Sequence, residues 1–197
     1  MANVKRTIPG YYFFRQRILI SLSTFCVFLI TAYKPVPQST EVPEYRVKAV
    51  FLYNFTQFVK WPQQVFRNEN TAFRIGVLGH DPFGDILDEV VKGEVIHGHP
   101  LEVVRYSRLE EVDCHILYIS ENNRDRLKHI LSKLKDKNVL TVSDIGGFAK
   151  AGGMIEFVER DKKIQLRINQ VPFKNAQLEI SAKLLRLAEV VSIDKSL

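Results

Sequence analysis

Phe-Arg-Ile-Gly-Val-Leu-Gly, at residues 73–79, is the stretch that decides the fold of this chain. It is short, almost wholly apolar and closed by glycine, which is typical of a strand buried on both faces. Residues 80–84 form a polar turn, and residues 85–91 then carry a short apolar helix pattern. A buried strand that runs directly into a helix is the first half of a βαβ unit.

The same alternation continues along the chain. Further strands are predicted at residues 101–106, 115–120 and 139–143, with a helical turn at 108–112, a helix at 122–135 and a strand pair or loop at 93–99. Strands and helices that alternate at this spacing predict right-handed crossovers, and therefore a mostly parallel sheet.

The end of the chain has a different pattern. Residues 154–159 and 164–168 are two strands joined by a charged turn, which predicts an antiparallel hairpin, and residues 175–191 are expected to form the last helix. The predicted fold is therefore three-layer α/β. It has a mostly parallel central sheet of about five to six strands, a C-terminal antiparallel hairpin and helices on both faces.

A strongly aromatic helix is predicted at residues 44–60, before the first strand. Its apolar residues recur at intervals of three and four, and Trp61-Pro62 ends it. The apolar arc is wider than one buried stripe needs. Tyr53, Phe58 and Trp61 are therefore candidates for an exposed partner-binding patch. The alternative is that all three belong to the core.

Residues 1–32 have the order of a secretory signal. Four positive charges without an acid precede an uncharged apolar run at residues 18–33, and Ala32 offers a small residue for cleavage. A run of 16 residues is shorter than most membrane spans. We expect a signal peptide at 1–32, a Pro-rich linker at 33–43 and one domain at 44–193. An uncleaved signal anchor is the alternative, and either places the domain in the periplasm.

The positive charge of the chain belongs mostly to this first segment. Subtracting its four charges from the net charge of +6 leaves +2. No dense basic stripe remains, so nucleic acid is not an expected partner. The cluster Lys128, Lys133, Lys135 and Lys137 lies beside acids and is typical of a solvated helix face. Cys26 falls within the signal, which leaves Cys114 without a disulfide partner.

Motifs for catalysis are absent from the sequence. It has no glycine-rich phosphate fingerprint, Walker motif or Gly-x-Ser-x-Gly elbow. His97 and His99 are a close pair without a third ligand nearby, so no metal or cofactor is predicted. Cys114 next to His115 is more typical of a small apolar core residue than of a nucleophile. The chain is therefore expected not to be an enzyme, with catalysis by His80, Asp81 or Asp144 as the remote alternative.

Two polar loops are the candidate ligand site. Ligands of open parallel sheets bind beyond the carboxyl ends of the strands, and both loops follow a predicted strand. Each loop combines an acid with glycines, which permit close approach of the backbone. Alternatively, the acids are caps and the glycines turn formers. The candidate residues are His80, Asp81, Phe83 and Gly84 in the first loop, and Ser143, Asp144, Gly146 and Gly147 in the second.

Six ordered blocks of the sequence match a known family pattern. They are residues 48–62, 75–84, 114–120, 140–148, 152–155 and 180–188. On these blocks the chain resembles the YfiR family from about Tyr45 to Val191, nearly all of the expected mature chain. Any one block alone would be a weak signal, whereas six in order are specific.

The resemblance implies a periplasmic, non-enzymatic regulator with an α/β fold. The namesake represses an inner-membrane diguanylate cyclase through the periplasmic part of that enzyme, which lowers cyclic-di-GMP and restrains biofilm formation. The implied partner is an inner-membrane diguanylate cyclase or sensor kinase. A small-ligand sensor module is the alternative, and a homodimer stays open. Relatives often carry cysteine at the position of Gly76, able to pair with Cys114, so the redox theme of the family is in question for this chain.

Overall fold

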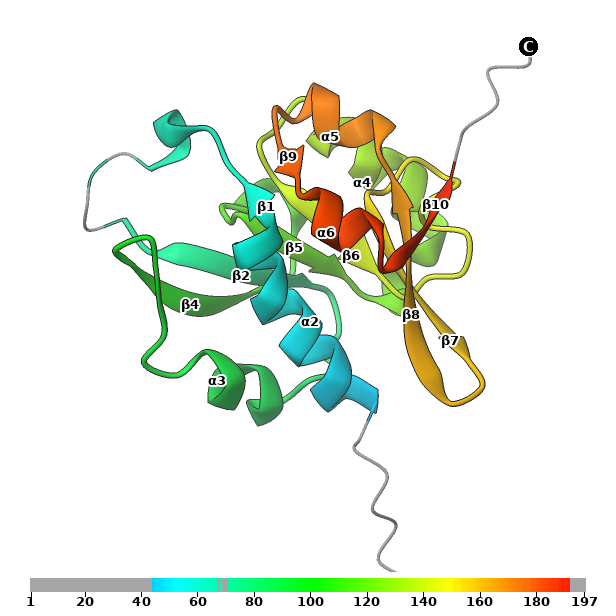
Figure 1. The fold of residues 1–197 in the computed structure, drawn as a ribbon, viewed down its shortest axis with the longest axis horizontal. Coiled ribbons are helices and arrows are strands. Elements are labelled where there is room, and N and C mark those ends of the chain that lie inside the picture. The colour runs from blue at the N-terminus through cyan, green and yellow to red at the C-terminus, as the bar shows by residue number, and fades with distance from the viewer. Residues whose placement is uncertain (1–43, 67, 69–70, 192–197) are drawn as a thin grey trace, which may run out of the picture. The chain divides into compact units, whose positions relative to one another are not determined.

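The computed structural model describes residues 44–66, 68 and 71–191, and element labels follow Figure 1. The predicted signal at 1–32, the linker at 33–43 and the last two residues of the predicted domain, 192–193, lie outside the described residues. Within the described part, no helix combines the length and apolar character that a membrane crossing needs.

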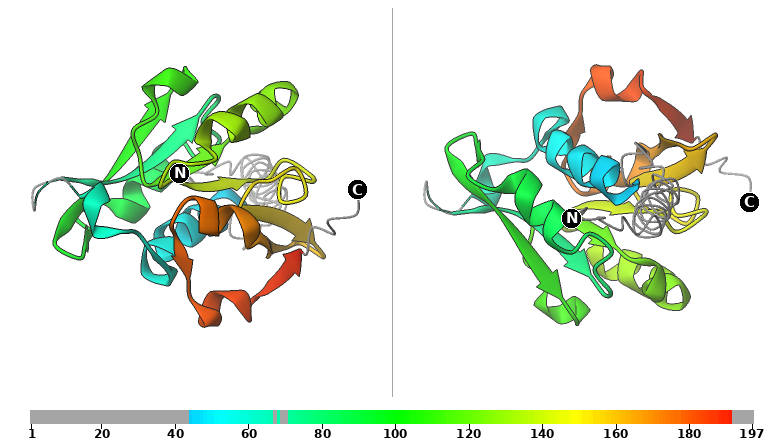
Figure 2. Two further views of the ribbon diagram at one scale, coloured as in Figure 1. Left: turned by 90° about the horizontal axis from the view of Figure 1, so that it is seen from above. Right: turned by 90° about the horizontal axis from the view of Figure 1, so that it is seen from below.

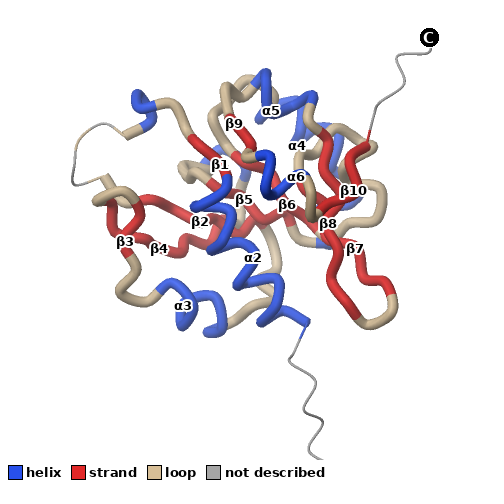
Figure 3. The backbone as a smooth tube through the Cα atoms, viewed as in Figure 1, coloured by secondary structure: helices blue, strands red, loops and turns tan. Residues whose placement is uncertain are grey.

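Eight strands form the central sheet, in the order β10-β8-β7-β6-β5-β2-β4-β3 (Figures 1 and 3). Their bounds are β2 (Phe73–Leu78), β3 (Val95–Ile96), β4 (His99–Tyr106), β5 (Ile116–Ile119), β6 (Leu140–Ser143), β7 (Ile155–Arg160), β8 (Lys163–Asn169) and β10 (Ala188–Val191). Only the β7–β8 and β3–β4 pairs of this sheet are antiparallel. A separate short ladder pairs β1 (Val59–Lys60) with β9 (Glu179–Ile180).

The helices lie on both faces of the sheet. They are α2 (Glu44–Phe58), α3 (Asp85–Val91), α4 (Leu127–Leu134), α5 (Val171–Asn175) and α6 (Ala182–Leu185), with 3₁₀ turns at Gln63–Val65, Leu109–Glu111 and Glu121–Arg126. Figure 2 shows α2 and α4 on opposite sides of the sheet. The sheet is therefore the middle one of three layers.

Two hydrophobic cores follow from the strand geometry, because successive side chains of a strand point to opposite faces. Ile75 and Val77 in β2 belong to the larger core, together with α2 and α3, whereas Leu78 belongs to the smaller core with α4. Strand β5 alternates in the same way, with Tyr118 in the larger core and Leu117 in the smaller one. A strand that supplies both cores has no polar face, as residues 73–79 predict.

The structure confirms the predicted fold class: a mostly parallel sheet, helices on both faces and an antiparallel hairpin, β7–β8. The sheet is wider than expected because short strands extend it on both sides. Strand β3 adds two residues beside β4, and β10 lies parallel to β8 outside the hairpin.

The predicted last helix at residues 175–191 is wrong. Helix α5 ends early because Gln177 adopts a left-handed φ of 55°. Strand β9 follows, and then Ser181 starts the one-turn helix α6 by accepting a hydrogen bond from the Leu184 amide at 3.2 Å. The β-branched pair Val190 and Val191 then pairs with β8. The leucines of this segment mimic helical spacing, but only Leu184 and Leu185 lie in a helix, α6, whereas Leu178 and Leu187 lie in the connections around it.

A buried carboxylate organises the glycine-rich crossover between β6 and β7. Glu156 is 2% exposed and accepts hydrogen bonds from the backbone amides of Gly147, at 3.1 Å, and Ala149, at 3.0 Å. Arg167 of β8 supplies a charged partner at 2.9 Å. Gly153 closes the turn, where an added Cβ would lie 2.1 Å from the ring of Phe148. The crossover is thus held by one side chain at its centre.

Replacing Glu156 with glutamine is expected to lower the free energy of unfolding by about 2 to 3 kcal/mol, because it leaves at least one backbone amide without an acceptor and Arg167 without its buried counter-charge. Urea unfolding measures this change. The matched control is Glu189→Gln, which removes the exposed partner of the same Arg167 at 3.2 Å and should cost little. Equal losses in the two variants would contradict a central role for Glu156.

Candidate functional site

The loop after β6 is tied to the first helix by a buried ion pair. The Lys48 ammonium lies 2.6 Å from the Asp144 carboxylate and also pairs with Glu44, and its side chain is only 3% exposed. Burial lowers the pKa of Lys48, but the hydrogen bonds that Lys48 donates to Asp144 and Glu44 outweigh this effect and raise the pKa above the usual value. The negative charge of Asp144 is therefore already paired with a full positive charge, that of Lys48.

Aromatic residues join this loop to the loop after β2. The Tyr45 hydroxyl lies 3.4 Å from Asp144, and the ring of Tyr45 meets Phe83 edge-on at 5.5 Å. Tyr118 of β5 contacts Phe83 at 4.8 Å and donates a hydrogen bond to Asp144. Burial and the charge of Asp144 raise the pKa of Tyr118. The structure thus brings Phe83 and Asp144 to one place at the carboxyl edge of the sheet, through Tyr45 and Tyr118.

The other predicted residues of the first loop are held by contacts within the turn and with neighbouring elements. Asp81 accepts a hydrogen bond from the Phe83 amide at 2.8 Å and one from Arg105 at 2.9 Å. Arg105 also reaches the Gly84 carbonyl at 3.0 Å, and its ion pair with Asp88 keeps the pKa of that carboxyl low. The backbone amide of His80 donates a hydrogen bond to the Asn122 side chain, which follows β5. The imidazole of His80 is exposed.

The second loop is also internally bonded. The buried Ser143 hydroxyl donates to the Ile119 carbonyl at 2.6 Å and accepts from the Ile145 amide at 3.0 Å. Gly147 has a φ of 83° and donates its amide to Glu156, whereas Gly146 is exposed. None of the eight predicted ligand residues lines the hollows described below. Ligand binding by these loops stays a prediction.

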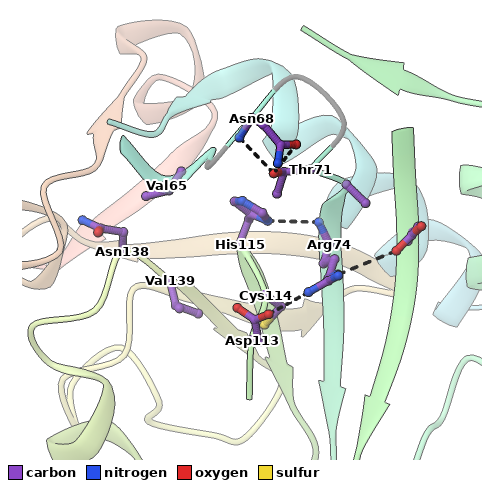
Figure 4. Close-up of a pocket in the computed structure, with 11 residues that line it drawn as sticks. Val65, Asn68, Thr71, Arg74, Asp113, Cys114, His115, Asn138 and Val139 are labelled. Atoms are coloured by element: carbon purple, nitrogen blue, oxygen red, sulfur yellow. Dashed lines mark hydrogen bonds and ion pairs between the residues drawn. The ribbon is translucent and has the colours of Figure 1, made fainter. Parts of the chain in front are cut away.

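A polar hollow of about 560 Å³ lies at the opposite edge, where β2, β5 and β6 begin (Figure 4). Arg74 crosses it, with its guanidinium 2.7 Å from Asp113 and 3.7 Å from Glu102. The remaining lining residues are Val65, Asn68, Thr71, Ala72, Cys114, His115, Asn138 and Val139.

His115 stands between this hollow and a stack of rings. Phe66 and Phe73 lie against its ring with centroids 4.9 and 4.6 Å away, and His99 stacks on Phe66 at 4.2 Å. The Nδ1 atom of His115 accepts the backbone N–H of Arg74 at 3.0 Å, so the neutral ring carries its proton on Nε2. Burial lowers the pKa of His115 to about 4, which keeps the ring neutral at physiological pH.

Cys114 borders the same hollow as a protonated thiol. It is 8% exposed, and burial raises its pKa to about 12, the opposite of a reactive cysteine. An added Cβ at Gly76 would lie 2.8 Å from its sulfur and 2.7 Å from the ring of Tyr106. Position 76 therefore lies beside the sulfur of Cys114, and here it is filled by glycine.

The three predicted partner residues are half-buried beside the larger core. Tyr53 donates its hydroxyl to Glu94 at 2.8 Å, and the Lys183 ammonium lies over the ring of Phe58 at 5.6 Å. Trp61 packs edge-on against a core phenylalanine and donates Nε1–H to the His115 carbonyl at 3.2 Å.

Trp61 also lines a second hollow of about 740 Å³. The other residues around it are Gln57, Val59, Lys60, Gln63, Phe66, Asn68, Phe73, His97 and His99. In the described residues, no group of three or more histidine, cysteine and carboxylate side chains is placed to hold a metal ion. The close pair His97 and His99 therefore lies at a polar rim.

Sequence reasoning missed Lys48 and His115, although a signal for each was present. Lys48 lies four and seven residues before Leu52 and Phe55, on the buried face of the helix. A charge on an apolar face needs a buried counter-charge, and Asp144 is that group. His115 likewise starts an otherwise apolar strand segment. Arg74, within the first strand, gave no such signal.

A family model described as YfiR/HmsC-like matches residues 45–189. The chain belongs to this family. The match confirms the resemblance inferred from the six sequence blocks and runs from α2 into the first half of β10.

Among solved structures, a crystal structure of a conserved domain protein from Vibrio cholerae biovar El Tor is 10% identical, with a TM-score of 0.47. The similarity covers 77% of this YfiR/HmsC-like chain and 61% of that protein, so the chain spans less than two thirds of its length. A search of curated protein sequences gave no match.

Acid is expected to destabilise the domain through His115. Its pKa is about 4 in the folded state, against 6.5 in an unfolded chain, so only the unfolded state gains a proton as the pH falls between these values. The stability gained from the neutral ring is complete above pH 6.5 and is lost as the pH falls toward 4. The free energy of unfolding then decreases by about 3 kcal/mol.

Chemical unfolding at several pH values, compared with that of His115→Asn, measures this effect. Asparagine keeps an acceptor near the Arg74 amide but does not titrate. Subtracting the two curves removes the carboxylates common to both proteins. Parallel curves between pH 6.5 and 4 would contradict the assignment.

Proposed function

We propose that this chain is a periplasmic signalling regulator that binds the periplasmic part of an inner-membrane diguanylate cyclase and represses it. Lower cyclic-di-GMP and less biofilm would follow. The family match over residues 45–189 carries the proposal, and the export pattern of residues 1–32 supports it. A membrane sensor kinase is the other partner class that fits a regulator of this kind.

Action by binding rather than by catalysis agrees with the chemistry of the described residues. The Cys114 thiol is buried with a raised pKa, and the carboxylate of Asp144 is neutralised by Lys48. Nucleophiles and general bases need accessible, activated groups, and these two are neither.

The proposed partner surface is the C-terminal half of α2 with Trp61. Tyr53 and Trp61 are fixed by hydrogen bonds, and Phe58 is covered by Lys183. Fixed aromatic side chains lose little conformational entropy on association, which favours them as anchors of an interface. The hollow beside Trp61 provides the concave surface, with Gln57 and Lys60 exposed at its rim.

Deleting the gene is expected to raise cellular cyclic-di-GMP, and the tagged chain is expected to capture a membrane cyclase from detergent extracts. Lys60→Glu, at the rim of the hollow, should weaken this capture, whereas Lys163→Glu in the β7–β8 hairpin should not. Unchanged cyclic-di-GMP together with no captured membrane signalling protein would overturn the proposal.

A second candidate function is sensing of a small ligand, favoured by the polar hollow at His115 and Arg74. A ligand at one hundred times its dissociation constant should stabilise the fold by about 2.7 kcal/mol, visible as a higher melting temperature. A thermal-shift screen of nucleotides, amino acids and vitamins tests this. Loss of the shift in Glu102→Gln would place the ligand in the hollow, whereas loss in Asp81→Ala or Asp144→Ala would place it at the predicted loops. No shift with any compound would contradict the sensing role.

A further inference from the structure

A third hollow, of about 310 Å³, lies between α4 and the segment that enters α5, away from the sites above. Figure 1 shows these two elements near each other. We name it the α4 groove. It is lined by Lys128, Leu131, Ser132, Lys135, Ala151, Gly152, Asn169, Val171, Pro172 and Asn175.

The charge of the α4 groove is wholly positive. Lys128 and Lys135 line it, no acidic residue does, and no ion pair within the described residues involves either lysine. Seven residues apart, they share one face of the helix, with their backbones about 10 Å apart along its axis. Unlike Lys48, which is paired with Asp144 and Glu44, these two lysines have their charges available to a partner.

An apolar surface lies between the two charges. Leu131 is half-buried midway between the lysines, and Val171, on the opposite wall, is 50% exposed. Pro172 extends the same wall. The groove therefore combines a strip of apolar side chains with a cation toward each end.

The walls of the groove are fixed before anything binds. The buried side chain of Asn169 donates a hydrogen bond from Nδ2 to the Ala149 carbonyl at 2.9 Å. Its Oδ1 accepts one from the Val171 backbone amide at 3.1 Å. Gly152 adopts a φ of 107° and donates its amide to the same Ala149 carbonyl at 3.3 Å. A preformed groove costs little ordering when a partner enters it.

We infer that the α4 groove docks an acidic segment of a partner protein, with two carboxylates about 10 Å apart on either side of an apolar side chain. The carboxylates pair with Lys128 and Lys135, and the apolar side chain packs between Leu131 and Val171. The inference goes beyond the proposed function because it names a second surface and does not depend on which membrane protein is regulated.

Two neighbouring lysines, one on α4 and one just after it, argue against a flat anionic membrane as the occupant. Lys133 and Lys137 are also exposed but do not line the groove. The affinity for an anionic lipid surface increases with the number of basic residues near it, so all four lysines would contribute to membrane binding. A segment seated in the groove would respond only to Lys128 and Lys135.

Fluorescence anisotropy with the full chain and the labelled peptide Asp-Glu-Leu-Leu-Glu-Asp tests the inference. Saturable binding is expected. Lys128→Glu with Lys135→Glu should weaken it at least tenfold, whereas Lys133→Glu with Lys137→Glu, which changes the net charge equally, should alter it less than twofold. Replacing both leucines of the peptide with serine should also weaken binding, because the apolar contact is lost. Circular dichroism checks that both double variants are folded.

Equal weakening by the two double variants, or no binding at millimolar peptide, would overturn the inference. Binding to phosphatidylglycerol vesicles that depends on all four lysines, with no preference for the peptide, would assign the surface to the membrane and overturn it as well. The assay contains no cyclase, so its outcome and that of the cyclic-di-GMP experiment are separate results.

Discussion

The contact on which the rest of the structure depends is the buried ion pair between Lys48 and Asp144. It joins the second turn of α2 to the carboxyl end of β6, two elements almost one hundred residues apart in sequence. Two charges removed from water must meet in one geometry, because either charge alone would be strongly unfavourable. Ala49, Leu52 and Phe55 of α2 are fully buried in the larger core. Close packing of these side chains and the ion pair therefore fix the position of α2 over the sheet together.

That position also decides where the molecule is open. Open parallel sheets usually bind ligands beyond the carboxyl ends of their strands. Here Tyr45, Phe83 and Tyr118 pack around Asp144 at that edge, so the polar groups that follow the strands are used internally. The hollow at His115 lies where the strands begin instead. In this open parallel sheet, the edge at the carboxyl ends of the strands therefore anchors α2 through Lys48 and Asp144.

The fold was largely predictable because the strands β2 and β5 supply two cores and β6 is buried along its whole length, which leaves no ambiguity about burial. Residues 171–191 were not, because leucines spaced for a helix are divided among short elements by the left-handed Gln177 and the cap at Ser181. The candidate site was predictable in part. Asp81 and Asp144 were recognised from their loops, but their partners Arg105 and Lys48 come from other elements, and only the tertiary fold brings them together.

A domain whose acids are mostly neutralised within its own structure is suited to act by recognition. Asp81, Asp144 and Glu156 each hold a turn or a helix in place through hydrogen bonds and ion pairs within the domain. The surfaces that we propose for partners are the aromatic side chains fixed at the end of α2 and the lysines Lys128 and Lys135 beside the α4 groove. These two surfaces belong to helices on opposite faces of the sheet (Figure 2). A regulator with two such faces can hold one protein while it responds to another, and the rigid sheet between them keeps their geometry constant.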